Sequence, residues 1–134
     1  MAGYSPNPLA KKLGLKAGHA VAVAGAPDDY PALIGAIARD LSLGRRVSAA
    51  TDVVHVFTTR RAELERRLAD LRAQLKPTAV VWISWPKKTS GVATDVTETI
   101  VRETGLAAGL VDVKICAVDE TWSGLKFVYR LSDR

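Results

Sequence analysis

The chain has 134 residues, of which 48% are hydrophobic and 25% are charged, which is the composition of one ordinary globular domain with a net charge of +5. Its one cysteine, Cys116, excludes an internal disulfide and favours a reducing compartment. No apolar run approaches the roughly 20 residues that cross a bilayer, and residues 1–8 lack the pattern of a signal peptide, so we expect a cytoplasmic protein with no membrane partner.

The first half of the chain alternates between helices and short strands. Pro8 favours a helix start, since proline is well tolerated at the first helical position. Asp28 and Asp29 precede Pro31, a typical helix start, and Gly44 is a typical helix end. The predicted elements are an extended arm over residues 1–8, a short helix over 8–13, a strand over 19–24, a helix over 31–44, an ambiguous edge strand over 46–48 and a strand over 52–57.

Two helices and three strands are predicted in the second half. Thr58 or Thr59 caps the first helix and Thr94 caps the second. The first helix has one buried face, because its leucines are spaced 4, 3 and 4 residues apart. These leucines are Leu64, Leu68, Leu71 and Leu75. The predicted elements are a helix from residue 60 to about 75, an apolar strand over 79–85, a helix from 94 to about 105, and strands over 110–118 and 125–131.

The last two strands form an antiparallel hairpin. In each strand, alternate apolar residues predict one buried face. These residues are Val111, Val113, Ile115 and Ala117 in the first strand, and Leu125, Phe127, Tyr129 and Leu131 in the second. The earlier strands alternate with helices, which predicts a mostly parallel sheet with helices on both faces. We therefore expect residues 1–134 to form a single α/β domain.

Two stretches resemble the S-adenosylmethionine-dependent methyltransferases. Residues 13–25 (LGLKAGHAVAVAG) look like the entry to the first strand of that fold, and residues 109–114 (GLVDVK) look like the exit from its last helix. This resemblance covers most of the chain and implies a small Rossmann-like, methyltransferase-like fold. The chain is, however, shorter than that family by roughly one strand–helix unit.

The chain departs from the methyltransferase pattern at the cofactor site. That family usually has a G-x-G-x-G turn after the first strand, whereas this chain has Gly25-Ala26-Pro27. Proline also removes a backbone donor. Residues 45–51 contain no acidic residue to hold a ribose. We therefore predict a retained scaffold without a cofactor, and a degenerate methyltransferase is the alternative.

A second resemblance is closer and runs nearly from end to end. The stretches that carry it are residues 58–65 (TTRRAELE), 85–95 (WPKKTSGVATD) and 118–126 (VDETWSGLK). They look like the signature stretches of a small actinobacterial family described only as a domain of unknown function. This resemblance implies membership of the family and brings no activity with it.

Other familiar kinds of site find no support in the sequence. The glycine patterns that bind dinucleotides or phosphates are absent, and so is the serine elbow of hydrolases. His19 and His55 lie on different strands, and Cys116 has no partner cysteine. We therefore expect no metal site and no catalytic residue, with His55 as a packed core residue and Cys116 as a small buried hydrophobe.

Loops that follow successive parallel strands meet at one edge of the sheet, where open α/β sheets bind ligands. One interpretation is that Lys87, Lys88 and Ser90 hold an anionic group while two tryptophans stack on a planar one. In the other, the lysines pair with Asp119 or Glu120 and the tryptophans fill a lost cofactor site. Besides Gly25-Ala26-Pro27, the predicted site residues are Thr58, Arg60, Trp85, Lys87, Lys88, Ser90, Asp119, Glu120, Trp122 and Ser123.

Three functions are consistent with this pattern. The leading one is a non-catalytic binding or regulatory module that recognises a small ligand or a protein at the carboxyl edge of its sheet. An enzyme of methyltransferase ancestry is the second. A weak, nonspecific nucleic-acid binder is the third, and the basic residues argue against it because many of them lie beside carboxylates on helices. Self-association through the edge of the terminal hairpin is also consistent with an exposed edge strand.

Overall fold

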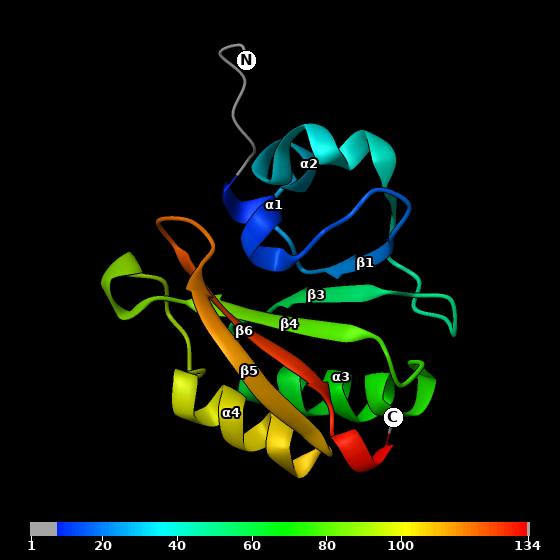
Figure 1. The fold of residues 1–134 in the computed structure, drawn as a ribbon. Coiled ribbons are helices and arrows are strands. Elements are labelled where there is room, and N and C mark those ends of the chain that lie inside the picture. Colours follow the sequence, from blue (N-terminus) through cyan, green and yellow to red (C-terminus); the bar gives the residue numbers. More distant parts are fainter. Residues whose placement is uncertain (1–7, 134) are drawn as a thin grey trace.

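The computed structural model describes residues 8–133, which form one six-stranded sheet between two layers of helices (Figure 1). The arm predicted for residues 1–8 lies outside the described residues, except for Pro8. The strands are β1 (Ala20–Ala24), β2 (Ser42–Gly44), β3 (Val53–Phe57), β4 (Val80–Pro86), β5 (Leu110–Ala117) and β6 (Trp122–Tyr129). The helices are α1 (Pro8–Leu13), α2 (Tyr30–Ile34), α3 (Arg61–Gln74) and α4 (Glu98–Ala107), with 3₁₀ turns η1 (Gly35–Asp40), η2 (Lys88–Ser90) and η3 (Leu131–Asp133).

The strand order is β2-β1-β3-β4-β6-β5. The first four of these strands are mutually parallel, and β6 runs antiparallel between β4 and β5. Helices α1 and α2 cover one face of the sheet, and α3 and α4 cover the other (Figure 1). The predicted α/β class, with its mostly parallel sheet and terminal antiparallel hairpin, is confirmed.

Each face of the sheet has its own hydrophobic core. The four leucines predicted to form one face of α3 are all buried against the sheet, together with residues of α4. On the other face, the fully buried Trp82 packs beneath α1 and donates a hydrogen bond from Nε1 to the carbonyl oxygen of Leu13 at 3.1 Å. The sheet is therefore a central layer buried on both sides, which explains the apolar character of β3 and β4.

The chain reverses its direction of travel across the sheet at β1. It passes from β1 to β2 on one side and then crosses back to β3 on the other side. Residues 45–52 make this crossing without a helix, and Val47 packs against the core on the α3 face. Such a reversal point leaves an opening at the carboxyl ends of the strands, which is where open α/β sheets bind ligands.

The helix predicted for residues 31–44 is wrong after Ile34. Gly35 has a φ of 85°, and the chain continues as the 3₁₀ turn η1 instead of an α-helix. Residues 42–44 then form β2, where Leu43 pairs with Val21. The edge strand therefore lies at residues 42–44 and not at the predicted residues 46–48. Gly35, with its positive φ, ends the helix ten residues before the predicted end.

The predicted helix caps are also displaced. α4 begins after Thr97, whose Oγ1 accepts a hydrogen bond from the Ile100 amide, three residues beyond the predicted Thr94. α3 begins after Arg60 instead of Thr58 or Thr59, and the carboxylate of Asp95 accepts the amide of Arg61 at 2.7 Å. The residue that caps the N-terminus of α3 thus lies in a loop far along the sequence, and a search among neighbouring residues does not find it.

Thr97→Ala is expected to destabilise the protein by about 1 kcal/mol, because it leaves the Ile100 amide without its acceptor. Urea unfolding followed by tryptophan fluorescence measures the change. Thr99→Ala is the matched control, since Thr99 is an exposed residue in the first turn of the same helix and does not cap it. Equal losses in the two variants would show that Thr97 does not act as the cap.

The terminal hairpin contains a β-bulge that the alternation did not predict. The register between β5 and β6 shifts between Asp112 and Lys114. Val111 and Ile115 consequently point to opposite faces, so the four apolar residues predicted for one face do not share it. Val113 and Ile115 are exposed on β5, the edge strand. Self-association through this edge stays a prediction.

Candidate functional site

A cavity of about 640 Å³ lies at the carboxyl ends of β1 and β2. Its wall is formed by the loop after β1, the start of α2, the end of β2 and one side chain of α3. This is the reversal point of the sheet, and the volume falls in the range of small-molecule sites. The residues that line it are Val23, Ala24, Gly25, Ala26, Pro27, Asp28, Tyr30, Pro31, Leu43, Gly44, Arg45 and Arg67.

Gly25 sets the shape of this cavity. Its φ is 69°, in the left-handed region that glycine tolerates best. A Cβ atom built on Gly25 would overlap the backbone carbonyl oxygen of Phe57, at the end of β3. The carboxyl ends of β1 and β3 therefore approach each other closely at this glycine, which brings the loop of residues 25–27 to the edge of the sheet.

Two arginines bring positive charge to this region. Arg45 directly follows β2, and Arg67 is on α3. Both also line a smaller adjoining cavity of about 230 Å³ under residues 45–47. The Nε atom of Arg67 is buried and has no hydrogen-bond partner among residues 8–133. Its Nη2 atom lies 4.0 Å from the Glu63 carboxylate, at the outer limit of an ion pair.

Some of the residues predicted for the site do meet in one place. Trp85, Lys87, Lys88 and Ser123 line a separate cavity of about 450 Å³, together with Pro86 and several residues between Val92 and Glu98. Trp85 is itself buried in the core beside α4. The Ser90 hydroxyl is nearby but donates to the carbonyl oxygen of Lys87 at 2.7 Å, and so stabilises the turn η2.

The two tryptophans lie on opposite faces of the sheet. Trp85 pairs with Ser123 across the ladder and Pro86 pairs with Trp122, so the two indoles point in opposite directions. Trp122 instead packs edge-to-face on Phe57, with ring centroids 5.2 Å apart. Trp85 and Trp122 therefore do not stack on one shared planar group.

The remaining predicted residues lie apart from the Trp85 cavity. Thr58 is buried and donates a hydrogen bond to Glu63 on α3, and Arg60 is the exposed residue before that helix. The Asp119 carboxylate accepts two backbone amides of its own turn, and Glu120 is exposed. Within residues 8–133 no ion pair joins the two lysines to these two carboxylates. The interpretation in which they pair internally finds no such contact in this part of the chain.

A buried polar chain beneath the cavity was not predicted. His55 is fully buried, as expected of a core residue, with Nδ1 lying 2.8 Å from the Tyr30 hydroxyl and Nε2 lying 2.7 Å from the Ser84 hydroxyl. Burial lowers the pKa of His55 to about 3 and raises the pKa of Tyr30. A histidine and a serine in adjacent apolar strands were the available signal. The hydrogen bonds from Tyr30 through His55 to Ser84 fix α2 on the sheet. Because Ser84 is fully buried, this group of side chains does not reach a substrate.

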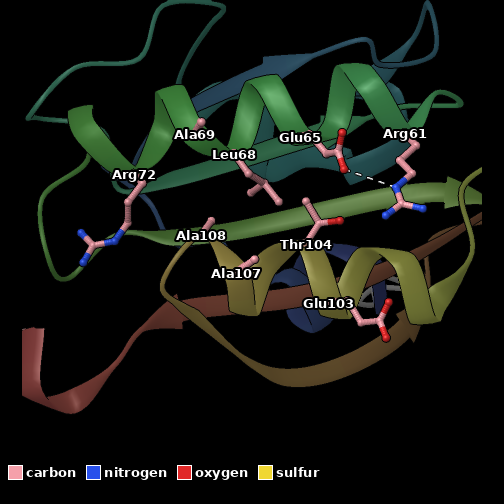
Figure 2. Close-up of a pocket in the computed structure, with 9 residues that line it drawn as sticks. All are labelled: Arg61, Glu65, Leu68, Ala69, Arg72, Glu103, Thr104, Ala107 and Ala108. Carbon is pink, nitrogen blue, oxygen red and sulfur yellow. Dashed lines mark hydrogen bonds and ion pairs between the residues drawn. The ribbon is translucent and has the colours of Figure 1, made fainter.

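A groove of about 560 Å³ separates α3 from α4 on the outer side of the molecule. Figure 2 shows Leu68 and Thr104 facing each other across it, with Arg61 hydrogen-bonded to Glu65 at one end and Arg72 at the other. Arg72 also forms an ion pair with Asp133 at 3.2 Å. Because these arginines already have carboxylate partners, they are less available to select a ligand in the groove.

Residues 8–133 offer neither a metal-binding cluster nor a membrane-spanning helix. This part of the chain contains no group of three or more His, Cys, Asp or Glu residues arranged to hold a metal ion. None of its helices combines the length and apolar character needed to cross a bilayer. Cys116 is half-buried, and burial raises the pKa of its thiol, which makes it a poor nucleophile.

The signature stretches of the sequence agree with a family model. Residues 10–131 match DUF3052, described as a protein of unknown function. The chain belongs to this family. The resemblance to a family described only as a domain of unknown function is therefore confirmed. No curated protein matches the chain.

The fold of this DUF3052 member is similar to that of solved methyltransferases. One is a SAM-dependent methyltransferase of Aquifex aeolicus, with a TM-score of 0.68, 15% identity, and coverage of 95% of this chain and 90% of that one. Another is precorrin-6y C5,15-methyltransferase of Geobacter metallireducens, with a TM-score of 0.63, 12% identity, and coverage of 91% and 86%. These likenesses confirm the methyltransferase-like fold.

A third solved neighbour carries a bound ligand. It is magnesium protoporphyrin IX methyltransferase of Synechocystis with bound SAH, with a TM-score of 0.52 and 12% identity. The match covers 68% of this chain, which spans about half the length (52%) of that enzyme. At this level of identity the likeness concerns the fold alone.

Proposed function

We propose that this DUF3052 protein is a non-catalytic module that binds a small ligand at the carboxyl edge of its sheet. The observation that carries the proposal is the cavity of about 640 Å³ at the carboxyl ends of β1 and β2, where the chain reverses its direction across the sheet. Gly25 brings the backbone to this edge, and charged groups of both signs line the cavity. This combination of a concave wall and a few polar groups is typical of ligand sites.

The cavity lining favours binding over catalysis. Among the described residues that line it there is no histidine, cysteine or serine, so no nucleophile and base face each other there. The one tyrosine, Tyr30, is held neutral by burial and is engaged with His55. The groups left to meet a ligand are Asp28, Arg45, Arg67 and the backbone, which suit recognition.

A thermal-shift screen tests the proposal. Adenine nucleotides, S-adenosylmethionine, S-adenosylhomocysteine, acyl-CoA and nicotinamide cofactors are added in turn to the full chain. A true ligand at about 100 times its Kd is expected to add about 2.7 kcal/mol of stability. Gly44→Phe should abolish that gain, since Gly44 lines the cavity and has open space beside it.

Ser42→Phe is the control for this variant. Ser42 lies two residues earlier on β2, on the same side of the strand, and does not line the cavity. Binding that survives in Gly44→Phe as well as in Ser42→Phe would contradict the proposed location. A screen in which no compound stabilises the protein would contradict the binding role itself.

A second candidate function is a methyltransferase-like enzyme. It is favoured by the solved methyltransferase neighbours, of which one holds SAH. Binding of S-adenosylmethionine at micromolar Kd, or transfer of its labelled methyl group to an acceptor, would support this candidate and exclude a purely non-catalytic role. The Gly25-Ala26-Pro27 turn, with its single glycine, argues against it.

The cavity beside Trp85 is proposed as a secondary site of the same module. Lys87 and Lys88 line its rim, where they suit an anionic group on a ligand or a partner protein. The double variant Lys87→Ala/Lys88→Ala is expected to weaken binding there and leave the stability unchanged within about 0.5 kcal/mol. Unchanged binding of every ligand or partner by this variant would remove the site from consideration.

A further inference from the structure

The positive charge at the sheet edge is concentrated where two cavities meet. The larger cavity and the smaller one share four lining residues, Val23, Ala24, Arg45 and Arg67. The carboxylates lie further out, since Asp28 lines only the larger cavity and Asp70 only the smaller. We call the place where these four residues lie the junction. A group bound at the junction is bordered by the guanidinium groups of Arg45 and Arg67, and no carboxylate is among the four residues.

The guanidinium group of Arg67 is only partly satisfied, because its Nη2 atom lies 4.0 Å from the Glu63 carboxylate, at the outer limit of an ion pair. Its Nε atom is buried without a hydrogen-bond partner in the described part of the chain, and a buried donor of this kind is rare in folded proteins. For Arg45, residues 8–133 provide no ion pair. By contrast, Arg102 hydrogen-bonds to the carboxylates of Asp112 and Glu98 at 2.9 and 3.0 Å. Arg45 and Arg67 are thus the two arginines that line both cavities, and each has donors left to meet an anion from outside the chain.

From this arrangement we infer that Arg45 and Arg67 bind the phosphate group of a small phosphorylated ligand at the junction of the two cavities. This inference rests on the proposed binding role and names its ligand class. A phosphate monoester has three acceptor oxygens and a charge near −2, so it satisfies two guanidinium groups that approach from different elements.

The rest of the larger cavity suits the body of such a ligand. Its volume of about 640 Å³ exceeds what a phosphate group alone would fill, and Val23, Ala26 and Pro27 offer apolar surface. The Asp28 carboxylate lies on the same wall, away from the junction, where it is able to accept a hydrogen bond from a hydroxyl group. The ligand class is therefore a phosphorylated small molecule that also carries hydroxyl groups.

Matched pairs of probes test the inference on the full chain. Inorganic phosphate, ribose 5-phosphate and AMP are titrated, with ribose and adenosine as the unphosphorylated counterparts. Calorimetry gives the affinity, and the NMR signal of the Arg67 Nε–H group reports contact at the junction. We expect the phosphorylated member of each pair to bind about tenfold more tightly or better, and the Arg67 signal to shift with it.

The sequence offers controls of equal charge. Arg45→Gln and Arg67→Gln are each expected to weaken phosphate-probe binding about tenfold or more, the size of a lost charge-assisted hydrogen bond. Arg46→Gln and Arg66→Gln remove the same charge from exposed neighbouring residues that line neither cavity, and should leave binding unchanged. Equal weakening in all four variants would reveal nonspecific attraction by the net charge and overturn the inference.

The remaining outcomes separate this inference from the proposed function. Phosphorylated probes that bind no more tightly than their counterparts overturn the inference. A ligand whose binding depends on Gly44 but not on Arg45 or Arg67 also overturns it, while the binding role stands. If no compound binds in a Gly44-dependent manner, both proposals fail.

Discussion

Replacing Gly25 by alanine is expected to destabilise the protein by about 2–4 kcal/mol. Roughly 1 kcal/mol of this arises because a residue with a Cβ atom is strained at a φ of 69°. The larger part, about 1–3 kcal/mol, arises because the new methyl group overlaps the carbonyl oxygen of Phe57, a backbone atom of the buried strand β3. Urea unfolding at pH 7 measures the total.

Gly14→Ala is the matched control for this variant. Gly14 has nearly the same backbone conformation, with a φ of 72°, but nothing lies within 4 Å of a Cβ atom built on it. Its loss should therefore be about 1 kcal/mol, and the difference between the two variants measures the close approach of β1 and β3. Equal losses at the two glycines would contradict that close approach.

The protein is expected to lose stability steadily as the pH falls below about 6.5. His55 has its pKa lowered to about 3 by burial, whereas an unfolded histidine titrates near 6.5. Between these two pKa values only the unfolded chain binds the proton. The contribution of neutral His55 to the free energy of unfolding is therefore fully present above about pH 6.5 and is lost as the pH falls towards 3. The slope is about 1.4 kcal/mol per pH unit, or about 2 kcal/mol between pH 6 and pH 4.5.

Urea unfolding across pH 4.5 to 7 measures this slope. The lower limit excludes most of the titration of Asp52, whose pKa is held below its usual value by Lys76. His55→Gln should lower the slope of unfolding free energy against pH by about 1.4 kcal/mol per pH unit, the contribution of one proton. The glutamine amide is expected to keep hydrogen bonds to the hydroxyls of Tyr30 and Ser84. His19→Gln removes the other, partly exposed histidine and should keep the slope. An unchanged slope in His55→Gln would refute a buried neutral His55.

Much of the fold was predictable because it follows from periodicity. The spacing of the leucines on α3 and the continuous apolar run of β4 both reflect burial against the sheet, and burial is what hydrophobic patterns record. The terminal hairpin was recognisable for the same reason. Errors occurred where a backbone conformation or a distant partner decides the structure, as at Gly35, at the Asp95 cap of α3 and at the bulge near Asp112.

The site was only partly predictable. The sequence places loops at the carboxyl edge, but the direction of each side chain depends on the register between strands. That register puts Trp85 and Trp122 on opposite faces. The sequence does not point to Arg45, because the predicted helix over residues 31–44 hides the strand that Arg45 follows. Arg67 has no distinguishing signal either, since a buried Nε atom leaves no signature in a helical pattern.

The three-residue strand β2 has a consequence for how the molecule opens. As an edge strand, β2 pairs with β1 alone, and it leads into the helix-free segment 45–52. Amide hydrogens of this margin, residues 42–52, should therefore exchange with solvent long before those of β3 and β4. Opening this margin uncovers the side of the larger cavity that Leu43 and Gly44 line. A ligand is thus able to enter through a local fluctuation, and its affinity is reduced by the free energy of closing that margin again.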